Sequence, residues 1–270
     1  MKRWAVLGAV CGALATAAAQ WPAAWAVAGA ASRASGGRVQ LADVRGSVWN
    51  GSAVLVLSGG PGSNDARALP GRVAWQARPS LHAAGDDGMA PGLRIAIAQD
   101  CCLREPLRLG VRAHAGGVEA RVGALDWQVP ASLLQGLGAP WNTLGFEGGL
   151  RLQAQALQWQ RGQGGSRLQG QLALTAERIS SRIAPRRSLG SYRLELDAQP
   201  PQRGGQPGRT TLQLRTLQGI LKLAGDGEWL AGQFRFRGEA RAQPGEESEL
   251  ANVLNLIGNR QGPITLRVLR

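Results

Sequence analysis

Apolar and polar side chains alternate along most of the chain after residue 38, which is the pattern of strands with one buried face. The alternation is clear at Leu93–Ile97, Leu107–Ala113, Leu168–Leu174 and Tyr192–Leu196. Because successive strand residues point to opposite faces, each of these segments presents one apolar face. We therefore expect a mainly β body, formed by a long curved antiparallel sheet or a two-sheet sandwich, with few short helices.

Turn and helix signals divide this pattern. Asn50-Gly51 predicts a tight hairpin turn, because both residues tolerate positive φ angles. A short helix is expected at Pro130–Gly138, which starts at a proline and ends in a glycine. A second helix is expected at Gly245–Ile257, where apolar residues form one stripe. Thr265–Leu269 is predicted to be a final strand.

The first part of the chain has a different character. No charged side chain occurs between Trp4 and Ser32. A helix needs ~20 mostly apolar residues to cross a bilayer, so this stretch is long enough. We expect residues 1–32 to be a transmembrane helix that anchors a β-rich domain of residues 33–270. A cleaved signal peptide, with a cleavage site at Ala28-Gly29-Ala30, is the alternative. The apolar region of a signal peptide is usually shorter than this stretch, which favours the anchor.

Basic residues lie on both sides of this anchor, and they bear on its orientation in the membrane. Lys2 and Arg3 favour a cytoplasmic N-terminus, with the body exported. Arg33, Arg38 and Arg45 follow the apolar stretch, so the count of positive charges does not distinguish the two sides.

The formal net charge of +13 and the pI near 11.4 invite a nucleic-acid-binding interpretation. However, lysine occurs only at positions 2 and 222, and the arginines are spread along the chain without a dense basic run. We therefore expect solvated strand faces and no nucleic-acid partner. Attraction to anionic lipid headgroups stays open.

Candidate catalytic chemistry is sparse. His82 lies near Asp86 and Asp87, but an exposed loop histidine is favoured over a metal ligand, and His114 is expected at a hairpin surface. The phosphate-binding GxxxxGK, the GxSxG nucleophile elbow and the HExxH zinc motif do not occur. We expect no enzymatic activity, no catalytic or metal-binding residue, no cofactor and no small-molecule substrate.

Cys101 and Cys102 are adjacent. Neighbouring strand residues point to opposite faces, so two free thiols with one facing the core are favoured over a vicinal disulfide. A strained vicinal disulfide or an intermolecular bridge is the alternative in an oxidising compartment.

Tryptophan outnumbers the other aromatic residues, with nine tryptophans against three phenylalanines and one tyrosine. Six of them lie at predicted strand ends or turn boundaries: Trp49, Trp75, Trp127, Trp141, Trp159 and Trp229. They could form a surface for protein or lipid partners, or close the ends of a sheet as core anchors; both interpretations are open.

An ordered series of motifs resembles a known family. Val44–Ala53 resembles the "G-T/S-x-W-x-G-x-A" signature of the inner-membrane N protein family of bacterial type II secretion systems. The further matches follow in order: Val73–Trp75 with Pro79, Pro185 with Ser188–Tyr192, Thr216–Gly225, Phe236–Ala240 with Pro244, and Leu254–Arg260. The similarity covers roughly Arg38 to Arg260, and its succession is more specific than any one motif.

The resemblance implies a single-pass inner-membrane protein with a large periplasmic body. Such a protein is an accessory part of the machinery that exports folded proteins across the outer membrane, and its partners are other type II secretion components. No catalytic residue can be transferred from the family. The motif positions are expected to be structural: Gly46, Trp49, Gly51, Trp75, Leu189, Gly190, Tyr192, Gly219, Gly225, Gly238, Asn255 and Gly258.

An AsmA-like periplasmic protein that binds or transfers lipid is the alternative function. Such proteins also combine an N-terminal anchor with a curved β-groove. A continuous apolar groove open to solvent would favour lipid binding, whereas a core filled by side chains would favour a scaffold.

Overall fold

A computed structural model describes residues 24–83, 89–114, 116–162, 165–184, 188–200, 208–230 and 233–257. The N-terminal half contains α2 (Ala24–Ala34), β1 (Val39–Gly46), β2 (Asn50–Ser58), β3 (Ala66–Ala68), β4 (Val73–Ala83), β5 (Met89–Gln99), β6 (Leu107–His114), β7 (Gly117–Val122) and β8 (Leu125–Pro130). The C-terminal half contains the 3-10 helix η2 (Ala131–Leu137), α3 (Trp141–Leu144), β9 (Glu147–Gly162), β10 (Gly165–Ser180), β11 (Gly190–Gln199), β12 (Arg209–Gly219), β13 (Leu221–Leu230), β14 (Gln233–Ala242) and α4 (Glu247–Ile257).

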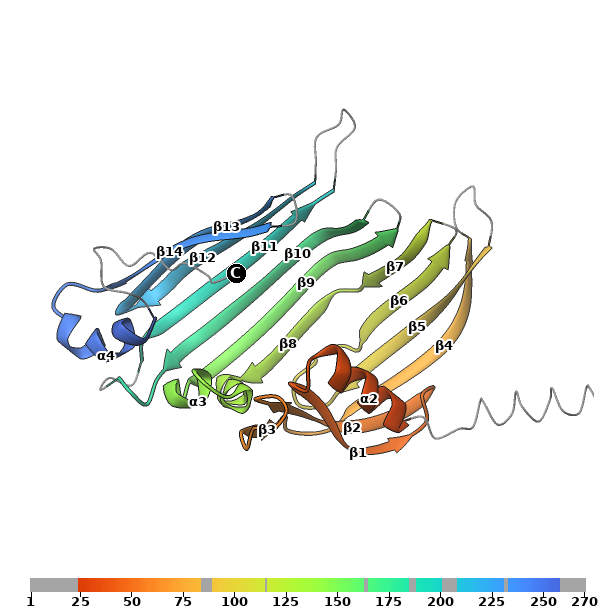
Figure 1. Ribbon diagram of the computed structural model, residues 1–270, viewed down its shortest axis with the longest axis horizontal. Coiled ribbons are helices and arrows are strands. Elements are labelled where there is room, and N and C mark those ends of the chain that lie inside the picture. The colour runs from red at the N-terminus through yellow and green to blue at the C-terminus, as the bar shows by residue number, and fades with distance from the viewer. Residues whose placement is uncertain are drawn as a thin grey trace, which may run out of the picture.

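All these strands belong to one open antiparallel sheet, so the long curved sheet and not the sandwich is the architecture found (Figure 1). The strand order is β1-β2-β4-β5-β6-β7-β9-β10-β11-β12-β13-β14, while β3 pairs with β2 and β8 pairs with β9. Nearly every strand is therefore hydrogen-bonded to the strand that precedes or follows it in the chain.

The register of the strands explains why the sequence alternates. Leu172 of β10 lies opposite Leu196 of β11, and Leu196 lies opposite Leu212 of β12. The next residues, Gln171 and Asp197, are paired in the same way on the other side. One face of the sheet is therefore lined by apolar side chains and the other by polar ones.

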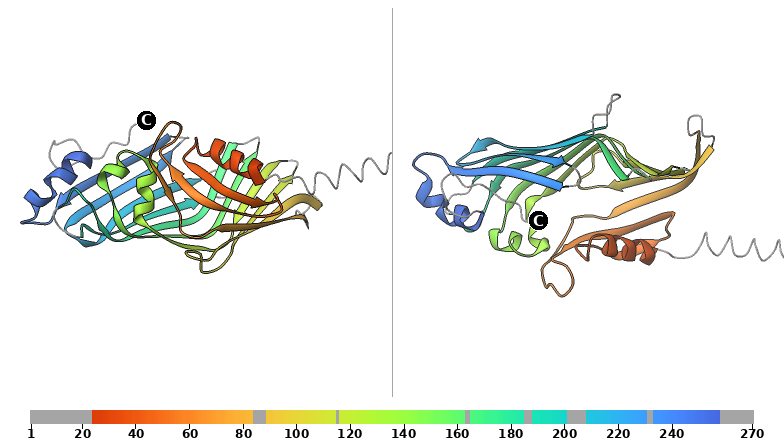
Figure 2. Two further views of the ribbon diagram at one scale, coloured as in Figure 1. Left: turned by 90° about the horizontal axis from the view of Figure 1, so that it is seen from below. Right: turned by 45° about the horizontal axis from the view of Figure 1, so that its top comes forward.

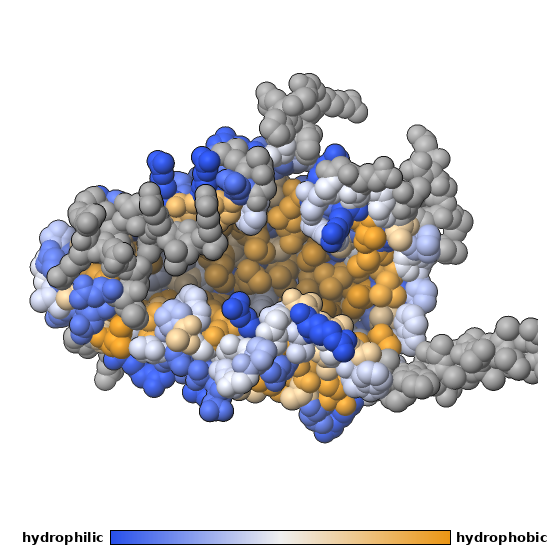
Figure 3. Space-filling view, in the orientation of Figure 1, coloured by the Kyte–Doolittle hydropathy of each residue, from blue (hydrophilic) through white to orange (hydrophobic). Residues whose placement is uncertain are grey.

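The sheet is strongly curved (Figure 2). Its apolar face is the concave one, as the space-filling view shows (Figure 3). Two non-glycine residues in its middle strands, Ala156 and Arg178, have φ angles of 49°. Both lie where the pairing of β9, β10 and β11 shifts register, which marks β-bulges. Bulges bend a strand and increase its twist, so they contribute to the curvature.

The helices cover parts of the concave side at one end of the sheet (Figure 1). The β4–β5, β9–β10 and β13–β14 turns lie at the other end, which we call the hairpin end. The larger core joins α4 to β10, β11 and β13, and its buried members include Leu189, Leu221, Leu250 and Val253. A smaller core contains Ala53 and Trp75, against which Val27 of α2 packs.

Both predicted helices are confirmed, at Ala131–Leu137 and Glu247–Ile257. The hairpin after β1 is also present, but the turn was placed wrongly. Gly46 pairs with Gly51, so the turn is residues 47–49 and Asn50 begins β2. The hydroxyl of Ser47 accepts hydrogen bonds from the N–H groups of Trp49 and Asn50, which stabilises this turn locally.

The predicted anchor is described only in its last part. Residues 24–32 belong to α2, which continues to Ala34, two residues beyond the predicted domain boundary. Among the described helices, none has the length and hydropathy needed to cross a bilayer. Residues 1–23, and the final strand predicted at Thr265–Leu269, lie outside the described residues.

Candidate functional site: two faces of one sheet

The first group of motif residues lies where β1, β2 and β4 meet. The indole of Trp75 donates hydrogen bonds to the carbonyl oxygens of Ser47 and Val48, at 3.2 and 3.1 Å. Gly51 lies under this ring, and a Cβ there would come within 2.5 Å of it. Gly46 has a φ of 86°, which favours glycine.

Trp49 lies in the turn of this group and differs from Trp75 in its exposure. Its carbonyl oxygen accepts a hydrogen bond from the Ala77 N–H at 2.7 Å, while its side chain is exposed. The group therefore fixes the first hairpin against β4, and Trp75 acts as a core anchor.

The second group joins β11 to β12 and β13. Tyr192 is buried, and its hydroxyl donates a hydrogen bond to the Leu221 carbonyl oxygen at 3.1 Å. Burial raises the pKa of this phenol well above its usual range. Gly190 and Gly219 are directly paired, and their backbones approach so closely that neither position has room for a Cβ.

Leu189 is buried in the same core, beside Leu250 of α4. Asn255, also in α4, is exposed, and Gly258 lies outside the described residues. The other residues of this part of the motif series lie in the core or in the contacts between β11, β12 and β13.

The third group lies on the concave face of the last two strands. Gly225 pairs with Gly238, and the ring of Phe236 lies over both glycines. Phe236 stacks on Phe234, and Phe234 contacts Trp229, with ring centroids 6.4 and 5.1 Å apart. The glycines therefore provide the space in which this aromatic cluster lies flat on the sheet.

Several ionisable groups of the described residues form ion pairs. Glu119 is 1% exposed and accepts hydrogen bonds from Arg112, Arg121 and Gln158. Burial opposes its ionisation, but the two guanidinium groups outweigh that effect and hold the pKa of Glu119 below its usual value. A hydrogen bond from Arg151 likewise lowers the pKa of Asp126.

No group of three or more potential metal ligands occurs among the described residues. His82 lies in β4 and His114 at the end of β6, so His82 is in a strand and not in the predicted loop. Asp86 and Asp87 lie outside the described residues, and the suggested site near His82 therefore gains no support.

The expectation for the cysteines was wrong. Cys101 and Cys102 form a disulfide with each other. They lie in the turn between β5 and β6 instead of in a strand, so their side chains need not point to opposite faces. The Cys101 sulfur also lies 2.9 Å from the Pro70 carbonyl oxygen, which places this turn against the start of β4.

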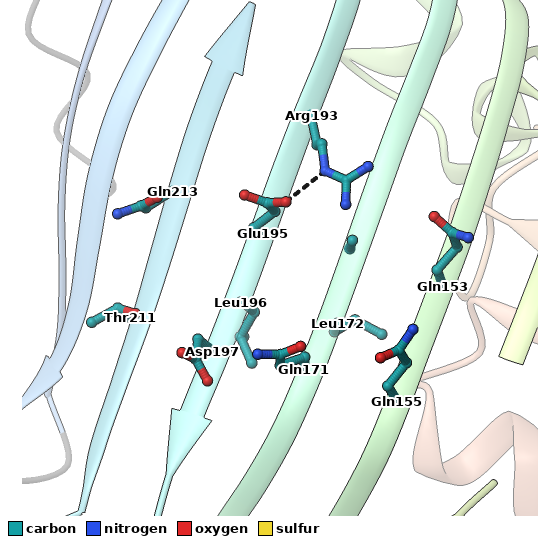
Figure 4. A pocket seen from close by; sticks show the side chains of 11 residues that line it. Gln153, Gln155, Gln171, Leu172, Arg193, Glu195, Leu196, Asp197, Thr211 and Gln213 are labelled. Atoms are coloured by element: carbon teal, nitrogen blue, oxygen red, sulfur yellow. Dashed lines mark hydrogen bonds and ion pairs between the residues drawn. The ribbon is translucent and has the colours of Figure 1, made fainter. Parts of the chain in front are cut away.

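The convex face is polar and contains a shallow hollow of about 340 Å³ over β9–β12. Figure 4 shows the hollow lined by amide, carboxylate and hydroxyl side chains from four neighbouring strands. Glu195 forms ion pairs with Arg193 at 2.6 Å and Arg215 at 3.2 Å. Such a mixed polar surface is suited to contact with another protein but lacks the apolar enclosure of a small-molecule site.

The concave face is apolar over almost the whole width of the sheet. Figure 3 shows hydrophobic side chains gathered in its hollow, with hydrophilic residues around the rim. Several large apolar side chains of this face are exposed: Val111 at 36%, Val118 at 40%, Trp159 at 36%, Trp229 at 48% and Phe234 at 36%. The sequence indicated the apolar face, but not that the helices leave much of it uncovered.

Comparison with known proteins shows which family the chain belongs to. The family model for type II secretion system (T2SS) protein N matches residues 37–267, which is most of the chain. The chain belongs to the type II secretion system protein N family. Neither the comparison with curated proteins nor that with solved structures gives a match.

Membership of the protein N family accounts for the motif series described above. The match begins two residues before β1 and includes all three groups of motif residues. Many of the described residues that carry the resemblance lie in strand pairs and cores, and the two faces of the sheet are candidate surfaces for function.

Proposed function

We propose that this protein is an accessory component of the type II secretion machinery, acting at the inner membrane with its body in the periplasm. In this role it supports the export of folded periplasmic proteins across the outer membrane through contacts with other components of the machinery. Family membership carries the proposal, since the matching model covers the whole sheet.

The convex face supports a role in protein contacts. The hollow over β9–β12 presents amide groups from Gln155, Gln171 and Gln213, all of which are exposed. Glutamine side chains both donate and accept hydrogen bonds, so this surface can pair with exposed polar groups of a partner. The nearby Arg193–Glu195–Arg215 ion pairs hold the surrounding charges in place.

The location rests on the first part of the chain. Residues 1–23 are almost free of charge and directly precede α2, which packs against the sheet through Val27. In the proposed arrangement this segment anchors the protein in the inner membrane as a single-pass helix, and the sheet begins close to the membrane surface.

Deletion of the gene tests the proposal in the native bacterium. We expect exported enzymes to accumulate in the periplasm, and the intact gene to restore their secretion. A variant that combines Gln155→Arg with Gln213→Arg should fail to restore secretion fully, because two new positive charges disrupt the amide surface. Gln76→Arg is the matched control, since Gln76 is exposed on β4, away from the hollow.

Immunoblots of culture medium and periplasm measure the outcome, together with the level of each variant. Secretion that is unchanged in the deletion strain would contradict the proposed role. Equal activity of the double variant and the Gln76→Arg control would exclude the hollow as the contact surface.

A further inference from the structure

We propose that the concave face of the sheet binds an acyl chain of one anionic phospholipid, with the headgroup held at the hairpin end. This inference does not depend on the proposed role in secretion. It starts from the uncovered apolar face (Figure 3), because an exposed continuous apolar surface of this kind marks a binding site.

The composition of the face indicates a hydrocarbon occupant. Strand pairing places Leu157 and Trp159 of β9, Leu172 of β10, Leu196 of β11 and Leu212 of β12 on it. On the described parts of β5–β13 the same registers place only one charged side chain there, that of Arg161 at the rim. A hydrocarbon chain needs no polar partner, so this surface suits it.

A polypeptide is a poorer fit to the same surface. The strands that form the face use their backbone N–H and C=O groups to pair with each other. A peptide lying across them would bury its own amide groups against apolar side chains without hydrogen-bond partners, which is unfavourable. Peptides that bind sheets add to an edge strand instead, and the edges here are β1 and β14.

The dimensions of the face are sufficient for one acyl chain. From Leu152 to Trp159 the apolar side of β9 extends ~23 Å at ~3.3 Å per residue. One leaflet of a bilayer contributes ~15 Å of hydrocarbon. At the end of the sheet beside α4, the face is closed by the core around Leu250 and Val253. An acyl chain would therefore enter from the hairpin end.

The hairpin end has the residues expected for a lipid headgroup and the membrane interface. Trp159, Trp229 and Phe234 lie near the turns with their rings partly exposed. Tryptophan is enriched at membrane interfaces because its ring is apolar and its N–H is polar. The Trp159 indole also donates a hydrogen bond to Ser166 across the β9–β10 hairpin, which holds the ring at this rim.

Positive charge at the same end selects an anionic lipid. Arg161 lies on the concave face beside the β9–β10 turn. Arg167 and Arg235 lie near the β9–β10 and β13–β14 turns, on the convex side of the same rim. All three are exposed, and within the part of the chain that the structure describes they form no ion pair or hydrogen bond. With a formal net charge of +13, the protein also attracts anionic membranes as a whole.

Native mass spectrometry of the full-length protein, incubated with a phosphatidylglycerol of defined chain length, tests the proposal. We expect one bound lipid per chain, and weaker binding of phosphatidylcholine with the same chains. Leu212→Glu places a carboxylate in the groove and should weaken binding at least tenfold. Ala224→Glu is the matched control, since Ala224 is exposed on the convex face of the neighbouring β13.

The headgroup is tested separately by replacing Arg161, Arg167 and Arg235 with glutamine. This triple variant should lose the preference for phosphatidylglycerol over phosphatidylcholine while still binding the chains. A variant with glutamine at Arg78, Arg104 and Arg237 is the control, because all three arginines are exposed but differently placed. Arg78 and Arg237 lie inside β4 and β14, and Arg104 lies in the β5–β6 turn, at the other end of the sheet from the β9–β10 turn.

Circular dichroism shows whether each variant folds, and the milder Leu196→Thr replaces Leu212→Glu if that variant does not. Absence of a bound lipid, or binding that neither groove variant weakens, would overturn the proposal. A dimer that Leu212→Glu dissociates would assign the face to a second copy of the chain instead. Loss of lipid binding with normal secretion would leave the proposed secretion role intact.

Discussion

Gly51 lies under the Trp75 indole, and this contact shows how a single hydrogen in place of a side chain can determine local packing. A Cβ at position 51 would lie 2.5 Å from the ring and 2.8 Å from the carbonyl oxygens of Arg45 and Ser47. Two of these three neighbours are backbone atoms of the β1–β2 hairpin, so the clash cannot be relieved by rotating a side chain. The motif glycine is therefore required by packing and not by its backbone angles.

Replacing Gly51 with alanine should lower the free energy of unfolding by about 1–3 kcal/mol, because the new methyl group overpacks the hairpin. Urea denaturation measures this difference. Gly110→Ala is the control, since no atom lies within 4 Å of a Cβ at that strand position, and we expect a change of less than about 0.5 kcal/mol. Equal effects of the two substitutions would show that loss of glycine itself, and not the indole contact, matters.

Glu119 is a buried, ionised residue on the convex face. Its folded-state pKa is lowered, so its contribution to stability is present above the unfolded pKa of about 4.5 and is lost as the pH falls through the folded value. Glu119→Gln should therefore reduce stability at pH 7, by about 1.5–3 kcal/mol, and much less at pH 3.

Urea denaturation at several pH values between 3 and 7 checks this. Glu239→Gln is the control, because Glu239 and its partner Arg241 are both exposed and such pairs contribute little. A Glu119→Gln variant whose destabilisation does not change with pH would contradict the assigned charge state.

At the scale of elements, alternation of apolar and polar residues predicted most strands, because the sheet has one apolar and one polar face throughout. It did not place the first turn correctly, since the Asn50-Gly51 signal was outweighed by the hydroxyl of Ser47 and the left-handed Gly46. It also misjudged Cys101 and Cys102, because a period of two says nothing about residues in a turn. The helix at Glu247–Ile257 was predicted correctly from its apolar stripe.

α4 closes the larger core, and its contact with β11 can be tested through the single tyrosine of the chain. Leu250 is fully buried, so Leu250→Ala should cost about 2–5 kcal/mol by leaving a cavity. Loosening of α4 should also lower the pKa of Tyr192 toward its usual value, because burial is what raises it.

Absorbance at high pH follows the tyrosinate, and urea denaturation measures the stability. Asn252→Ala is the control on the exposed side of the same helix, and it should leave both quantities nearly unchanged. A pKa of Tyr192 that stays as high in the Leu250→Ala variant as in the unaltered protein would show that α4 does not cover the phenol.

At the scale of the whole molecule, the sequence left two architectures open, and the structure has the single curved sheet. The curvature could not be predicted, because two of the bulges that bend the middle strands lie at Ala156 and Arg178, which are not glycines. The apolar face was expected, but whether side chains or helices would fill it depends on contacts between distant segments. The structure was therefore needed to identify the two faces as separate candidate sites.

The order of the strands in the sheet also affects how the chain can fold. Because almost every strand pairs with its neighbour in sequence, the sheet can grow by adding one hairpin after another to an existing edge. Few strands pair with a strand that lies much later in the sequence. During synthesis, which proceeds from the N-terminus, strands can therefore be added to the sheet one after another. α4, which follows all the described strands, then covers the core that the strands have built.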